Sequence, residues 1–155
     1  MTHIQPSGPL RLDDLLSADK ILFFPDTDRK KEILLQLVRT ALPSITLPEA
    51  ESLAAQIDKR EDTISTALPT GVALPHARVE GLEELKVALA VFKHPVLFSG
   101  GKKVQALLLF LSPADPAFFR WHLQLLSICA QTFTTEFIHK LTSCRNAQQA
   151  VSLFK

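Results

Sequence analysis

The chain has 155 residues, a length that suits one domain with a substantial core. Its 17 basic and 16 acidic residues nearly cancel, so the basic excess typical of a nucleic-acid-binding protein is missing. Apolar residues make up 46% of the chain, which excludes a disordered protein. The longest apolar runs are about a third of the ~20 residues that a membrane helix needs. We therefore expect a globular domain that neither binds nucleic acid nor inserts into a membrane.

Residues 1–9 contain proline, serine and glycine and no hydrophobic stretch. This composition predicts a flexible N-terminal tail and no signal peptide, with the folded domain over residues 10–155. The two cysteines, Cys129 and Cys144, are too few and too widely spaced for a disulfide scaffold or a zinc knuckle. A reducing, cytoplasmic location is the simplest expectation.

The first part of the chain is predicted to form one strand and two helices, over Ile21–Phe24, residues 26–42, and Thr46 to about Lys59 or Arg60. Pro25 closes the strand, and the acidic residues at 26 and 28 are expected to cap the first helix. Thr46 and Glu49 have the spacing of a capping box, which predicts the start of the second helix.

Three more strands and three helices follow in the prediction: strands over Gly71–Leu74, Lys86–Phe92 and Val104–Leu111, and helices over 115–132, 135–142 and 146–154. The strands are continuously apolar, which is typical of a sheet covered on both faces. Gly100 and Gly101 predict a turn between the last two strands. The order β-α-α-β-β-β-α-α-α indicates an α/β fold, a single domain with a mixed β-sheet between helical layers.

One histidine stands directly after a predicted strand. His76 follows Pro75, which lacks an N–H and cannot donate to a strand ladder. The imidazole is therefore expected just past the strand's end, and binding groups of α/β folds often lie at the carboxyl ends of strands. A Pro-His pair by itself is more often a turn with an exposed histidine, so this reading needs support from other residues.

A second histidine lies on an apolar helix face. At about 100° per residue, His122 falls near the middle of the arc that Phe118, Leu125 and Cys129 occupy. An inward imidazole without a hydrogen-bond partner costs a few kcal/mol. His122 is thus either a core histidine bonded to a backbone carbonyl or a site histidine that steadies an anion near His76.

Cations and hydroxyls flank the first histidine in the sequence. Arg60 and Arg78 are candidate partners for a doubly negative phosphoryl group, because a guanidinium can donate two hydrogen bonds at once. Ser65 and Thr66 are candidate hydroxyl donors. The commoner fate of a single arginine is an exposed surface charge, and that alternative stays open for both.

Other chemistries have less support. A nucleophile pair of Cys129 with a histidine is possible, but a free cysteine is more often a buried packing residue. The sequence has no H-x-x-x-H, H-E-x-x-H or C-x-x-C spacing and no phosphate-binding glycine loop. We therefore predict no metal site and no cofactor.

Together these residues resemble a known family. The segments Arg60-Glu61-x-x-x-Ser65-Thr66, Gly71-Val-Ala-Leu-Pro-His76 and His122-Leu-x-Leu-Leu are similar to the fructose, mannitol and nitrogen-regulatory (type 2) EIIA domains of the bacterial phosphoenolpyruvate-dependent phosphotransferase system. The resemblance covers the chain from about Leu12 to Phe154. Two departures are Thr66-Ala-Leu-Pro69, where the family commonly has a glycine-rich run, and Gly100-Gly101, where it often has Asp-Gly.

The resemblance implies a phosphotransferase component that carries a phosphohistidine and has no small-molecule substrate of its own. It implies that His76 accepts a phosphoryl group from HPr or a nitrogen-branch HPr-like protein, with Arg60 near the phosphate and His122 as the second site histidine. The group would pass to an EIIB domain, as in sugar transport, or serve as a signal.

Two alternatives to a carrier remain. In a purely regulatory module, phosphorylation would control the binding of a regulated protein without sugar transport. In a decayed domain there would be no phosphoryl transfer at all, but the presence of Arg60, His76 and His122 argues against it.

Overall fold

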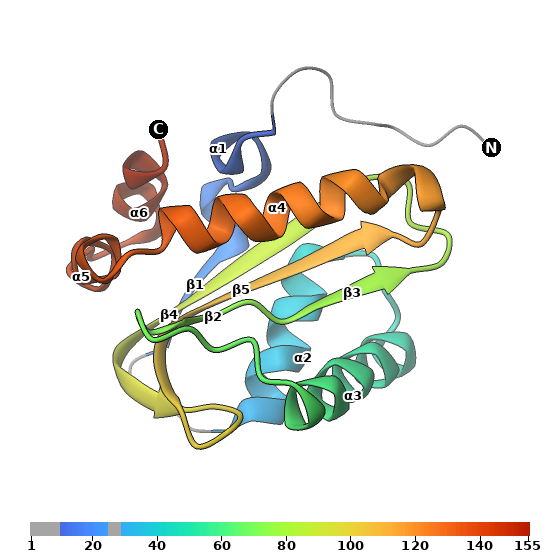
Figure 1. Cartoon of the computed structure of the whole chain (residues 1–155), viewed down its shortest axis with the longest axis horizontal. Coiled ribbons are helices and arrows are strands. Elements are labelled where there is room, and N and C mark those ends of the chain that lie inside the picture. Colours follow the sequence, from blue (N-terminus) through green and yellow to red (C-terminus); the bar gives the residue numbers. More distant parts are fainter. Residues whose placement is uncertain (1–9, 25–28) are drawn as a thin grey trace.

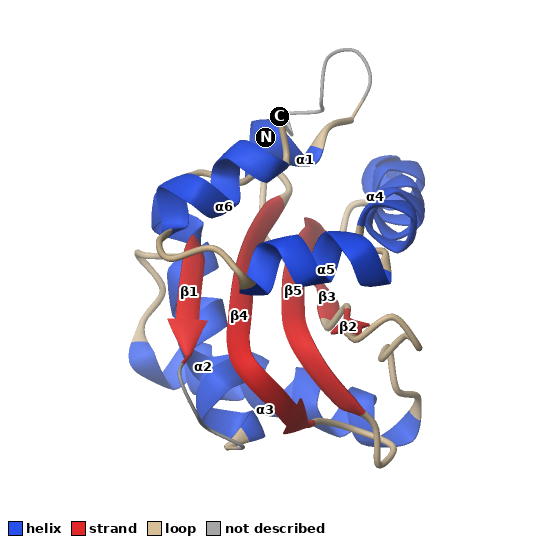
Figure 2. Cartoon of the chain, turned by 90° about the vertical axis from the view of Figure 1, so that its left-hand side faces the viewer, coloured by secondary structure: helices blue, strands red, loops and turns tan. Residues whose placement is uncertain are grey.

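A five-stranded mixed sheet lies between two layers of helices in the computed structural model, which describes residues 10–24 and 29–155 (Figures 1 and 2). The strands are β1 (Ile21–Phe24), β2 (Val72–Ala73), β3 (His76–Val79), β4 (Lys86–Leu97) and β5 (Lys103–Pro113). The α-helices are α1 (Leu12–Leu15), α2 (Lys30–Ala41), α3 (Leu47–Thr63), α4 (Phe119–Thr132), α5 (Thr135–Thr142) and α6 (Ala147–Leu153). Two short 3₁₀ turns, η1 (Ala18–Lys20) and η2 (Pro116–Phe118), precede β1 and α4. The predicted α/β fold class is confirmed.

The sheet is mixed because its longest strands are antiparallel and the others join them in parallel. β4 and β5 form an antiparallel hairpin, β1 pairs in parallel with β4, and both β2 and β3 pair in parallel with β5. Gly100 and Gly101, both with φ near +70°, form the hairpin turn that the sequence predicts. β2 and β3 thus occupy one edge of the sheet, and β1 occupies the other.

Two hydrophobic cores lie on the two faces of the sheet. In β5, Ala106, Leu108 and Phe110 face the helices α4, α5 and α6, whereas Leu107, Leu109 and Leu111 face α2 and α3. β4 alternates in the same way. Because side chains alternate along a strand, a sheet covered on both faces needs apolar residues at every position. This accounts for the continuous apolar runs of both strands.

The helix boundaries reflect their caps. The Thr46 hydroxyl accepts from the Glu49 amide (3.3 Å) and donates to the Glu49 carboxylate (2.8 Å), so Thr46 is the N-cap of α3 as predicted, with one of the two side chain–amide bonds of a capping box. The Asp115 carboxylate accepts from the Ala117 amide (2.8 Å), but the first turn is the 3₁₀ turn η2 and the α-helix begins only at Phe119.

The structure corrects several predicted boundaries. His76 is not in a turn after a strand but is the first residue of β3, an additional strand that the prediction missed together with α1. The strand expected over Gly71–Leu74 is only β2, because the ladder is interrupted at Leu74 and Pro75. α3 runs to Thr63, beyond the predicted end near Arg60, and β4 and β5 are longer than predicted at their ends. The expected caps of α2 and the expected N-terminal tail lie outside the described residues.

None of the helices in the described ranges is long and apolar enough to cross a membrane.

Candidate functional site

His76 lies at the edge of the sheet and faces the layer of α4. Val72 and Leu74 belong to the core on that side, and the alternation of side chains directs residue 76 the same way. Pro75 cannot donate to β5, yet its carbonyl accepts from the Phe110 amide (3.1 Å), so the strand resumes in register with His76 opposite Phe110. The interruption therefore displaces no side chain to the other face.

The His76 ring is held from one nitrogen and one face. Its Nδ1 lies 2.8 Å from the carbonyl oxygen of Leu74, and its ring stacks on Phe110 with centroids 5.0 Å apart and planes 12° apart. A carbonyl can only accept, so Nδ1 must carry the proton. In the neutral ring, Nε2 then has a free lone pair. An imidazole that attacks through Nε2 must be in this tautomer.

His122 lies on α4, and its ring contacts the ring of His76. The two ring centroids are 5.0 Å apart in an edge-on arrangement, and Phe110 contacts both rings. Nδ1 of His122 is hydrogen bonded to the hydroxyl of Ser112 on β5. Both histidines are buried, at 8% and 5% relative exposure. The helical-face prediction that His122 points inward is confirmed, and its partner is a serine hydroxyl instead of a backbone carbonyl.

The surroundings keep both imidazoles neutral. Burial lowers the pKa of His76, and the Arg60 charge lowers it further, while the Leu74 carbonyl and Glu61 act in the opposite direction. Burial lowers the pKa of His122 to about 4, with further contributions from His76, Arg78 and Arg60. At neutral pH the pair is therefore uncharged, and the positive charges of Arg60 and Arg78 act on it, a setting suited to an incoming anion.

The two arginines occupy different environments. Arg60, near the C-terminal end of α3, is exposed, and its guanidinium has no hydrogen bond or ion pair within the described ranges. Its charge still acts on both histidines. Arg78 on β3 donates through Nη2 to the carbonyls of Ala114 (3.2 Å) and Asp115 (2.9 Å) and lies over Phe119. Its Nη1 is buried and has no hydrogen-bond partner among the described residues.

The hydroxyls of Ser65 and Thr66 are engaged within the protein. Thr66 donates to Glu61 (2.5 Å) and accepts from the Leu74 amide (2.9 Å). Ser65 accepts from the Ala67 amide (3.1 Å) and donates to the carbonyl of Ser99 (3.3 Å), and its oxygen lies 2.8 Å from the Ser99 hydroxyl. In this conformation each hydroxyl proton is already used, so either residue must leave its present bonds to donate to an anion.

Glu61 is a buried site residue that the sequence analysis missed. It is only 3% exposed, and its carboxylate accepts from the Thr66 amide and hydroxyl and from the Ser99 hydroxyl (2.9 Å). A signal was present, because Glu61 continues the buried stripe of Ala50, Ala54 and Ile57 at helical spacing. A carboxylate on such a stripe must have internal donors.

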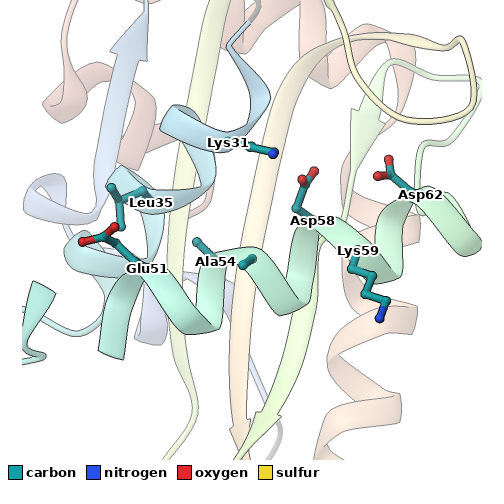
Figure 3. A pocket seen from close by; sticks show the side chains of 8 residues that line it. Lys31, Leu35, Glu51, Ala54, Asp58, Lys59 and Asp62 are labelled. Carbon is teal, nitrogen blue, oxygen red and sulfur yellow. The ribbon is translucent and has the colours of Figure 1, made fainter. Parts of the chain in front are cut away.

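A separate hollow lies between α2 and α3 (Figure 3). It has a volume of about 440 Å³, and charged side chains of both signs line it, namely Lys31, Glu51, Asp58, Lys59 and Asp62. None of the predicted site residues lines it. Among the described residues, no group of three or more histidine, cysteine, aspartate or glutamate side chains is placed to hold a metal ion.

Known proteins resemble the chain over most of its length. A nitrogen regulatory protein of Pseudomonas aeruginosa is 26% identical over 140 residues, which cover 90% of this chain and 91% of that protein. The crystal structure of the nitrogen regulatory protein IIA-Ntr from Neisseria meningitidis matches with a TM-score of 0.75 at 23% identity. The match covers 93% of this chain and 99% of the chain in that structure.

A second similar structure contains two proteins. The complex of enzyme IIA mannitol and phosphorylated enzyme IIB mannitol from Escherichia coli has a chain that matches with a TM-score of 0.65 at 12% identity, covering 90% of this chain and 96% of its own. At this identity the likeness shows the fold alone.

The sequence model of one family matches most of the chain. Its description is the phosphoenolpyruvate-dependent sugar phosphotransferase system, EIIA 2, and it matches residues 14–155. The similar fold of the IIA structures agrees with this match. The chain therefore belongs to the EIIA 2 family of the phosphoenolpyruvate-dependent sugar phosphotransferase system.

Proposed function

We propose that this chain is a phosphocarrier that accepts a phosphoryl group on His76 from HPr or a nitrogen-branch HPr-like protein. The observation that carries the proposal is the buried pair of His76 and His122, in which the Leu74 carbonyl leaves Nε2 of His76 unprotonated. Family membership supports the same reaction class. As with other phosphohistidine carriers, the acceptor would be a protein and not a small molecule.

The proposed step exchanges one N–P bond for another. The lone pair on Nε2 of His76 attacks the phosphorus of the donor's phosphohistidine, the donor's N–P bond breaks, and the donor nitrogen recovers that electron pair. Nδ1 of His76 keeps its proton throughout. Such a transfer depends mainly on positioning and on charge stabilisation, so it needs no covalent machinery beyond the two imidazoles.

The proposed roles of the other residues follow from charge. Arg60 would move over the phosphoryl oxygens, because its guanidinium is exposed and without a bond in the described ranges. His122 would donate from Nε2, with Ser112 bonded to its Nδ1. The unpartnered Nη1 of Arg78 is a further donor, whereas Ser65 and Thr66 would contribute only after leaving their present bonds.

Exposed apolar side chains near these residues would suit a docking partner. Phe119 and Leu123, about half exposed, lie one helical turn apart on α4 on either side of His122, and Ile64 follows α3 with 72% exposure. We expect HPr to bind here before transfer and an EIIB domain afterwards. One similar structure is a complex of enzyme IIA mannitol with phosphorylated enzyme IIB mannitol, which supports an EIIB domain as a partner. A cytoplasmic location is part of this proposal.

Labelling from phosphoenolpyruvate tests the proposal. The chain is incubated with labelled phosphoenolpyruvate, enzyme I and HPr, or with their nitrogen-branch equivalents. We expect an acid-labile, base-stable label on the wild-type chain and none on His76→Ala. A matched control is His139→Ala, since His139 is an exposed histidine on α5. An unlabelled wild-type chain, or labelling of His76→Ala equal to that of the wild type, would contradict the carrier proposal.

A second candidate is a purely regulatory module, favoured by the similarity to two nitrogen regulatory proteins. In that case phosphorylation of His76 controls the binding of another protein and feeds no sugar transport. Adding an EIIB domain to the labelled chain separates the two candidates. Rapid loss of label favours transport, and a retained label with a changed set of bound proteins favours regulation.

A further inference from the structure

Glu61 lies at the start of a chain of contacts that ends at the histidine ring. Its buried carboxylate accepts from the Thr66 hydroxyl (2.5 Å) and from the Thr66 amide (3.0 Å). The Thr66 hydroxyl oxygen accepts from the amide of Leu74 (2.9 Å), and the carbonyl of Leu74 accepts from Nδ1 of His76 (2.8 Å). Each hydrogen bond in this chain has one possible direction, because carboxylates and carbonyls only accept and amides only donate.

The direction of these bonds decides which nitrogen of His76 carries the proton. Thr66 has a single hydroxyl proton, which it donates in a hydrogen bond to Glu61. The Thr66 oxygen is therefore oriented to accept from the Leu74 amide. This bond holds the backbone of Leu74 in place. The next residue, Pro75, has no amide proton that could form a competing hydrogen bond. The Leu74 carbonyl is thereby aimed at Nδ1 of His76.

The carboxylate also joins the histidine segment to the β4–β5 turn. The Ser99 hydroxyl donates to Glu61 (2.9 Å), and Lys102 donates to the carbonyl of Ala67 (3.3 Å). Ser99 is 2% exposed, so this anchor is sheltered from water. A buried carboxylate with three internal donors holds its position well, since leaving any donor unpaired is costly.

We infer that Glu61 is a positioning residue: acting through Thr66 and Leu74, it holds His76 in the tautomer with the proton on Nδ1 and the lone pair on Nε2. The inference rests on the proposed function only in saying what this tautomer is used for. Glu61 itself is not expected to touch the phosphoryl group, because its oxygens are occupied by Thr66 and Ser99.

The substitution Glu61→Gln tests the inference, because it keeps the shape of the side chain. An amide nitrogen in place of one oxygen donates where the carboxylate accepts, so at least one of the three donors loses its partner. The primary readout is the ¹⁵N chemical shift of the two His76 ring nitrogens by NMR, which reports the tautomer without any phosphoryl donor. The second readout is the rate of labelling from phosphorylated HPr.

We expect the wild-type ring to be predominantly protonated on Nδ1 and the Glu61→Gln ring to shift toward protonation on Nε2. The labelling rate should fall by up to about 100-fold, the cost of misplacing a reacting group by about 1 Å. Asp62→Asn is the matched control, because it removes the same charge from the next residue of α3, where the side chain is 63% exposed. That control should leave the His76 tautomer as in the wild type.

Thr66 provides a second test that does not depend on the folding of Glu61→Gln. Thr66→Val keeps the shape but removes the hydroxyl, and it should shift the tautomer in the same direction. Thr66→Ser keeps the hydroxyl and should restore the wild-type tautomer, which a loss of packing alone would not do. Wild-type tautomer populations in both Glu61→Gln and Thr66→Val would overturn the inference.

The two readouts separate this inference from the proposed function. A shifted tautomer in the variants of a chain that HPr never labels would support the positioning role and contradict the carrier. Normal labelling of a Glu61→Gln chain whose tautomer is unchanged would do the opposite.

Discussion

The role of His122 depends on the residues that pack against its imidazole. Within α4 it looks like a core histidine, flanked by fully buried Phe118 and Leu125. In the folded chain it stands edge-on to His76, with Phe110 packed against both. A buried histidine whose pKa is about 4 stays neutral at pH 7, so it can donate a hydrogen bond without adding a charge.

The first prediction concerns this residue. His122→Ala should slow phosphorylation of His76 by about 100- to 1,000-fold, because it removes a donor to the developing charge. The measurement is the single-turnover rate of label transfer from phosphorylated HPr. Ser112→Ala should slow the transfer less, since it leaves the ring but frees its Nδ1. A His122→Ala rate within twofold of the His139→Ala control would contradict a direct role.

At the scale of elements, α3 contributes two of the charged residues of the site. Arg60 and Glu61 lie in its last turns, where successive residues point in different directions. Arg60 therefore faces solvent, where it can reach an incoming anion, and Glu61 faces the core. The stability of this helix depends on its start at Thr46, because the Thr46 hydroxyl satisfies the Glu49 amide, which has no carbonyl partner within the helix.

The second prediction concerns that cap. Thr46→Ala should lower the free energy of unfolding by about 1 kcal/mol, the usual cost of losing an N-cap hydroxyl. Urea unfolding followed by circular dichroism measures the change. Thr63→Ala in the last turn of the same helix is the control, because its hydroxyl only bonds back to the Lys59 carbonyl (3.2 Å). Equal losses in the two variants would show that the cap contributes nothing.

At the scale of the whole molecule, the site lies on one edge of the sheet, where β3 and α4 meet. The two histidines come from segments 46 residues apart in sequence number, and the β5 strand between them in space supplies Phe110 and Ser112. Because both faces of the sheet are covered, the rings are buried in the native state and solvated in the unfolded chain. Burial of two bases that must stay neutral makes folding sensitive to acid.

The third prediction is the sign of that sensitivity. Both histidines have a native pKa below the unfolded value of 6.5, so at low pH the unfolded chain binds more protons than the native chain. Stability should therefore be fully present above pH 6.5 and fall as the pH drops toward 4. His122 alone can contribute at most about 3 kcal/mol to this loss.

Urea unfolding at pH 7.5, 6, 5 and 4.5 measures this dependence. His122→Gln should show a shallower loss over that range, because its side chain does not titrate. His139→Ala should retain the steep loss, since His139 is exposed on α5. Parallel curves for the wild type and His122→Gln would contradict the account.

Much of the fold was predictable because its signals are local. Continuous apolar runs marked β4 and β5, helical spacing marked α2, and the spacing of Thr46 and Glu49 marked the start of α3. β3 was missed because Arg78 and Val79 lack a strand pattern, and it forms only through pairing with β5. The inward direction of His122 was also predictable, since a helix face is a property of one segment.

By itself the sequence determined the fold class, the family resemblance and the set of side chains from which a site is built: His76, His122, Arg60 and Arg78. Only the tertiary structure decided that His76 and His122 meet, that the Leu74 carbonyl selects the protonated nitrogen, and that Glu61 bonds to Thr66 in the segment before His76. The physical reason is that periodicity reports which face of an element is buried, whereas a hydrogen bond between loops depends on how remote elements pack. Such bonds leave no repeating pattern along the chain.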